Sequence, residues 1–125
     1  MEISIDLKMM KEIAFRDESL LQQMLAEWKD DSNMKIREIR NAWIETDPRR
    51  LFYRIHELKT NFTMLHCHTA IRLAEQMVRD LEMQLPVRES DLNALEGMVL
   101  AIQRKLEPEN RSDSGEHFII DKPTT

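Results

Sequence analysis

The strongest constraint on the fold is an apolar repeat in the middle of the chain. Leu51, Ile55, Leu58, Phe62 and Leu65 follow one another at spacings of four, three, four and three residues. An α-helix has about 3.6 residues per turn, so these five side chains share one face. The repeat therefore predicts an amphipathic helix whose apolar seam packs against a core.

Similar spacing recurs elsewhere, and prolines divide the periodic part of the chain into segments. Further helices are expected over about 17–45, 70–85 and 92–106, with a weaker leading helix within 5–13. Asp47 and Pro48 form a favourable helix start, because Asp accepts a bond from a free backbone N–H and Pro lacks the N–H that would need a partner. Prolines 86 and 108 follow the last two helices.

A turn is expected near His66, although neither Gly nor Pro marks it. One continuous helix over 48–85 would be roughly 57 Å long at 1.5 Å per residue, too long for a compact domain of this size. The expected fold is all-α: an antiparallel four-helix bundle with a short additional N-terminal helix over residues 1–107. Residues 108–125 read as a polar, flexible C-terminal tail in which the apolar run 118–120 is available for docking.

Composition narrows the class of protein. The 125 residues suit one domain, and only two are glycine. A net charge of −5 argues against a general nucleic-acid surface, and no apolar stretch reaches the roughly 20 residues needed to span a bilayer. The first fifteen residues are too charged for a secretory signal, and the lone Cys67 fits a reducing compartment. We expect a cytoplasmic monomer.

A second stripe lies beside the apolar seam. Phe52, His56, Lys59 and Thr63 repeat at spacings of four, three and four, one position after the seam residues. This stripe is rotated by about 100° from the seam, so His56 is expected at the edge of the bundle. Lys59 lies one turn further along, which predicts an imidazole and an ammonium side by side on a rigid helix.

That pair of side chains suits phosphoryl transfer. A neutral imidazole is a nucleophile near pH 7, and an adjacent ammonium both disfavours its protonation and balances phosphoryl oxygens. Such a transfer needs mainly positioning and charge neutralisation. No glycine-rich phosphate loop occurs, so a phosphoryl donor must come from outside the chain. A surface His with a nearby Lys is also common on amphipathic helices that have no such role, so the pair becomes specific only with the residues around it. With them, we expect a phosphoryl carrier without cofactor, and not an enzyme.

The run Leu51–Lys59 resembles the phosphorylated helix of histidine phosphotransfer (HPt) domains. That helix has a small or apolar residue, His, any residue, an apolar residue and Lys, matched here by Ile55, His56, Leu58 and Lys59. The resemblance extends to Leu65, to the 73–82 pattern of the next helix and to Trp28 in the long preceding helix. Roughly residues 5–106 are covered.

The resemblance implies a four-helix bundle that relays phosphate between receiver domains. His56 would be phosphorylated on the ring nitrogen far from the main chain, with Lys59 as its charge partner. Phe52, Arg49, Thr60 and Thr63 would border the surface for response-regulator receiver domains, or for a hybrid sensor histidine kinase. The receiver would supply Mg²⁺.

Two positions depart from the family pattern, which has Gly where this chain has Thr60 and His66. Thr60 is expected to narrow access to the imidazole, and His66 to adopt a left-handed backbone at some cost. These losses motivate an alternative, a degenerate HPt-like adaptor that binds a receiver or partner helix without phosphotransfer.

Other candidate sites are weaker. His66, Cys67 and His68 are metal-binding residue types, but successive helical positions point apart, so a turn with a buried thiol is the preferred interpretation and no metal site is expected. Carboxylates such as Glu75 are interpreted as scattered charges on exposed helix faces.

Overall fold

A computed structural model describes residues 3–107 and 117–120. The described chain is mostly helical, with five helices and a small sheet of two strands. In chain order the elements are β1 (Ile3–Asp6), α1 (Lys8–Ile13), α2 (Glu18–Ile44), α3 (Pro48–Met64), α4 (His68–Glu82), α5 (Glu89–Leu106) and β2 (His117–Ile120).

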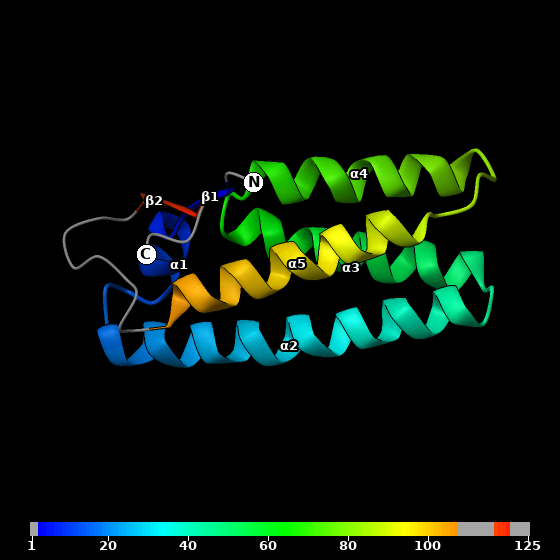
Figure 1. The fold of residues 1–125 in the computed structure, drawn as a ribbon. Coiled ribbons are helices and arrows are strands. Elements are labelled where there is room, and N and C mark those ends of the chain that lie inside the picture. The colour runs from blue at the N-terminus through cyan, green and yellow to red at the C-terminus, as the bar shows by residue number, and fades with distance from the viewer. Residues whose placement is uncertain (1–2, 108–116, 121–125) are drawn as a thin grey trace.

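The four long helices lie lengthwise beside one another, and the short elements gather at one end (Figure 1). Helices α2 and α4 each pack against both α3 and α5. The seam predicted on α3 is confirmed, because Ile55, Leu58, Phe62 and Leu65 are completely buried. One continuous apolar core receives side chains from β1 and all five helices.

Helix α3 begins where the sequence predicts. Asp47 is its N-cap and accepts a hydrogen bond from the backbone N–H of Arg50 at 3.1 Å, and Pro48 is its first residue. Asp17 caps α2 in the same way, through the N–H of Leu20. These caps satisfy backbone donors that have no partner within the helix.

The helices end without glycine. The turn near His66 is confirmed, and His66 has a φ of 52°, in the left-handed region. Its N–H donates to the carbonyl of Thr63, and the N–H of Cys67 donates to that of Phe62. This is the Schellman pattern, in which two bonds satisfy the last carbonyls of a helix. Thr46 and Gln84 end α2 and α4 in the same way, with φ of 54° and 60°.

The helical content is consistent with the all-α expectation, and a small two-stranded sheet, which the sequence did not predict, is added to it. β1 and β2 pair antiparallel, with Ile3 opposite Ile120 and Asp6 opposite His117. Four residues of the expected flexible tail therefore form a strand, while 108–116 and 121–125 lie outside the described residues. Local periodicity missed this sheet because its strands come from opposite ends of the chain.

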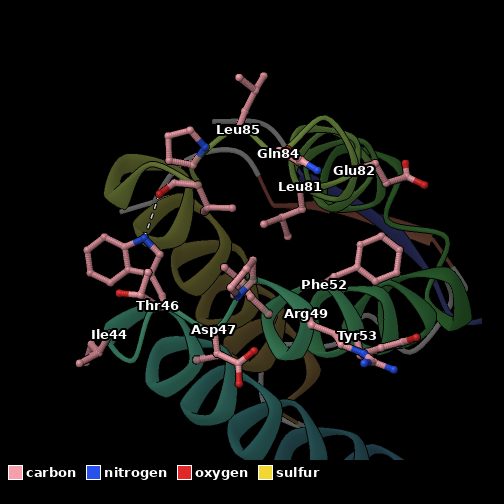
Figure 2. A pocket seen from close by; sticks show the side chains of 16 residues that line it. Ile44, Thr46, Asp47, Arg49, Phe52, Tyr53, Leu81, Glu82, Gln84 and Leu85 are labelled. Carbon is pink, nitrogen blue, oxygen red and sulfur yellow. Dashed lines mark hydrogen bonds between the residues drawn. The ribbon is translucent and has the colours of Figure 1, made fainter.

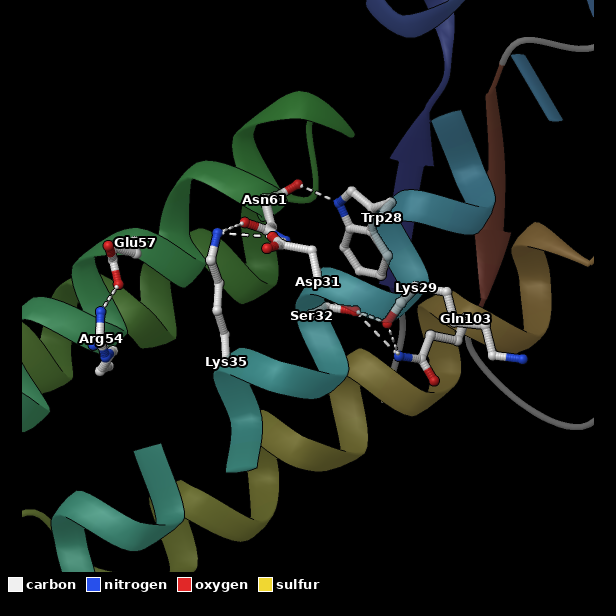
Figure 3. A network of polar contacts seen from close by, with 9 residues as sticks. All are labelled: Trp28, Lys29, Asp31, Ser32, Lys35, Arg54, Glu57, Asn61 and Gln103. Carbon is white, nitrogen blue, oxygen red and sulfur yellow. Dashed lines mark hydrogen bonds and ion pairs between the residues drawn. The ribbon is translucent and has the colours of Figure 1, made fainter. Parts of the chain in front are cut away.

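Polar side chains also link α2 to its neighbours (Figure 3). The indole N–H of Trp28 donates to the carbonyl of Asn61, one of the last in α3, at 2.9 Å. The Asn61 side chain, 4% exposed, donates to Asp31 and accepts from Lys35, each at 2.8 Å. Because buried polar groups need partners, these bonds favour one register between α2 and α3.

Candidate functional site

His56 lies near the middle of α3 and is exposed to solvent. Its ring is parallel to that of Phe52, with an interplanar angle of 1° and 6.3 Å between ring centroids. Phe52 is half-buried and also meets the ring of Tyr53 edge to face. The aromatic neighbour restricts the imidazole on one side while leaving it open to a partner on the other.

Lys59 forms an ion pair with Glu75, a residue to which the sequence analysis assigned no role. Its Nζ atom lies 3.3 Å from Oε2 of Glu75 on α4, and the two side chains are 31% and 41% exposed. The ammonium thus lies on the His56 side of α3 but is engaged across the α3–α4 interface. The turn at His66 explains the pairing, because Lys59 precedes it by seven residues and Glu75 follows it by nine. Folding about that turn brings the two positions together.

The other expected site residues lie on the same surface. Thr60 and Thr63 are exposed, and the Thr63 hydroxyl donates to the carbonyl of Lys59 at 3.0 Å. That bond stays within α3 and leaves the hydroxyl oxygen able to accept another. Arg49 is exposed in the first turn of α3, at the rim of a pocket.

An apolar pocket of about 1190 Å³ opens beside Phe52 (Figure 2). The α2–α3 and α4–α5 connections that border it lie at the end of the molecule opposite the sheet (Figure 1). Phe52 of α3 and Leu81 of α4 flank the pocket, and the α2–α3 and α4–α5 connections complete its wall (Figure 2). The indole N–H of Trp43 anchors the second connection through the carbonyl of Val87 at 2.9 Å. Sequence reasoning did not find this pocket, since no single periodic segment encodes it.

The residues around the α3–α4 turn were the other candidate site. The rings of His66 and His68 lie 6.4 Å apart. Cys67 between them is fully buried, and burial raises the pKa of its thiol, which disfavours the thiolate that binds metals. Among residues 3–107, no three His, Cys, Asp or Glu side chains gather in a metal-binding arrangement.

Comparison with known proteins gives no relative. Neither a protein-family model, nor a curated protein, nor a solved structure matches the chain. Within the described part of the chain, none of the helices has the length and apolar character needed to cross a bilayer. The geometry of the site therefore carries the functional argument.

Proposed function

We propose that this chain is a histidine phosphotransfer domain of two-component signalling. In this proposal the four long helices form an antiparallel bundle, and His56 accepts a phosphoryl group from a receiver aspartate and passes it to another receiver. The observation that carries the proposal is the exposed imidazole on a long, well-packed helix, stacked on Phe52 and open to a protein partner.

The chemistry is a transfer from oxygen to nitrogen. The unprotonated ring nitrogen of His56 attacks the phosphorus of the receiver's aspartyl phosphate, so an N–P bond forms while the O–P bond breaks. The electron pair of the broken bond stays on the aspartate carboxylate, and the other ring nitrogen keeps its proton or releases it to water. The reverse sequence passes the group to the next receiver.

The surrounding residues serve charge balance and docking. Lys59 neutralises phosphoryl oxygens, as ammonium groups do in phosphoryl transfer. Phe52, Arg49, Thr60 and Thr63 border the receiver, and the apolar pocket beside Phe52 offers surface for a partner to bury. The receiver provides Mg²⁺ and the activated phosphate, so the chain acts as a carrier and not as a kinase. In this proposal it acts in the cytoplasm.

The direct test is phosphoryl uptake from purified receivers. Receiver domains of the source organism, charged with acetyl phosphate and then freed of it, are each mixed with the wild-type chain and with His56→Gln. We expect rapid labelling of the wild type by one or more receivers, with an acid-labile, base-stable bond, and no labelling of His56→Gln. The proposal would be ruled out if wild type and His56→Gln were labelled equally, or if no receiver labelled either chain.

A non-transferring adaptor is the second candidate function. It is favoured by the exposed Thr60, which adds bulk one turn from His56, and by the engagement of Lys59 with Glu75. Receiver binding that survives His56→Ala, with no phosphohistidine in the wild type, is the outcome that distinguishes the adaptor.

A further inference from the structure

The ion pair between Lys59 and Glu75 ties the charge partner of His56 to a second helix. Its Nζ–Oε2 separation is 3.3 Å, and the side chains of Lys59 and Glu75 are 31% and 41% exposed. Exposed pairs of this kind contribute about 0–1 kcal/mol, so a stronger anion can displace the carboxylate. The Lys59 ammonium is thus held in place but remains able to move to another acceptor.

Two nearby cations, Arg54 of α3 and Lys35 of α2, are engaged with carboxylates of α2. Arg54 pairs with Glu38 of α2 at 2.5 Å, and Lys35 of α2 pairs with Asp31 at 2.8 Å. Lys59 instead points towards α4, on the side of α3 that carries Phe52 and His56. A phosphoryl group on His56 and the Glu75 carboxylate therefore compete for the same ammonium.

We infer that Glu75 is a positioning residue that limits how strongly the phosphoryl group is held on His56. This inference rests on the proposed phosphotransfer function. With the phosphoryl group on His56, the Lys59 ammonium must either leave the Glu75 carboxylate or contact both anions at once. Either change weakens the Lys59–Glu75 ion pair, so it makes phosphorylation of His56 less favourable. Glu75 thereby keeps the phosphohistidine a good donor, so that the group moves on to a receiver.

The experiment measures the equilibrium of transfer between the chain and one receiver, the domain that labels the wild type fastest in the uptake test. Glu75→Gln is compared with wild type, and Glu57→Gln serves as the matched control. Glu57 adjoins His56 in sequence but pairs with Arg54 at 2.8 Å. We expect Glu75→Gln to raise the equilibrium constant for phosphorylation of His56 roughly three- to fivefold, and Glu57→Gln to change it less than about twofold.

A double-mutant cycle shows whether Glu75 acts through Lys59. In the Lys59→Ala background the effect of Glu75→Gln should fall below about twofold, and in wild type it should shrink at high salt because exposed charges are screened. An unchanged equilibrium in Glu75→Gln, an equal shift in Glu57→Gln, or a shift that persists without Lys59 each overturns the inference. In those cases the wild type still takes up phosphate and His56→Gln does not, whereas failure of the proposed function leaves both chains unlabelled or labels them equally.

Discussion

Removing the Lys59 ammonium tests whether this residue acts in phosphoryl transfer or only stabilises the fold. In Lys59→Ala, phosphoryl uptake should slow about 10- to 100-fold, because a charge-assisted contact to the phosphoryl oxygens is lost. The fold should be retained, since the pair with Glu75 is exposed and weak. Stopped-flow transfer assays and circular dichroism check the two parts. Loss of helical signal in Lys59→Ala would instead assign Lys59 a structural role.

Asp31 links acid stability to the contact between α2 and α3. Burial tends to raise its pKa, but hydrogen bonds from Lys35 and Asn61, together with the Lys35 charge, outweigh burial and lower the pKa. A lowered pKa in the folded state stabilises the protein above the unfolded-state value of about 4, and this contribution is lost as pH falls through the folded-state value. Urea titrations should show the acid-side loss in wild type and a smaller one in Asp31→Asn. An identical acid slope in both would contradict this assignment.

At the scale of elements, the helix ends are closed by residues that are poorly suited to their backbone conformation. Gln84 has a φ of 60°. This left-handed backbone conformation costs a non-glycine residue about 1–2 kcal/mol. Gln84→Gly should therefore stabilise the fold by about 0.5–1 kcal/mol after the entropy of the unfolded chain is counted. The same substitution at Gln76, exposed within α4, should destabilise it by about 1 kcal/mol. Urea midpoints measure both, and equal destabilisation would show that the turn is not strained.

The elements were predictable to different degrees. The seam of α3 and the start at Pro48 follow from the sequence, because periodicity and capping act within a few residues. The positions of Thr46 and Gln84 did not follow, since neither residue type marks a turn. The pairing of Lys59 with Glu75 could have been predicted by placing the two helices antiparallel about the turn at His66. The pocket and the hydrogen bonds of Asn61 could not, because they depend on how separate helices pack together.

For the whole molecule, the β1–β2 pair joins the two ends of the chain. Ile3, Ile5 and Leu7 are at most 2% exposed, so the N-terminal segment is part of the core. A chain that ends at Glu107 loses the partner of β1. Its free energy of unfolding should fall by about 2 kcal/mol, which is the net contribution expected of a few backbone hydrogen bonds. Amide exchange should rise across Ile3–Asp6 and stay slow in α3. A chain that ends at Asp121 keeps β2 and should behave as wild type; unchanged exchange in the shorter chain would show that β2 does not hold β1.

The central claim is that His56 carries the phosphoryl group, and locating that group on the protein tests it most directly. The chain charged by a phosphorylated receiver is examined by phosphorus NMR and by peptide mapping under mildly basic conditions, with His66 and His68 as internal comparisons. The account predicts a phosphoramidate signal confined to the peptide that contains His56. A phosphoryl group on the His66–His68 segment or on a side chain other than His56 would contradict it.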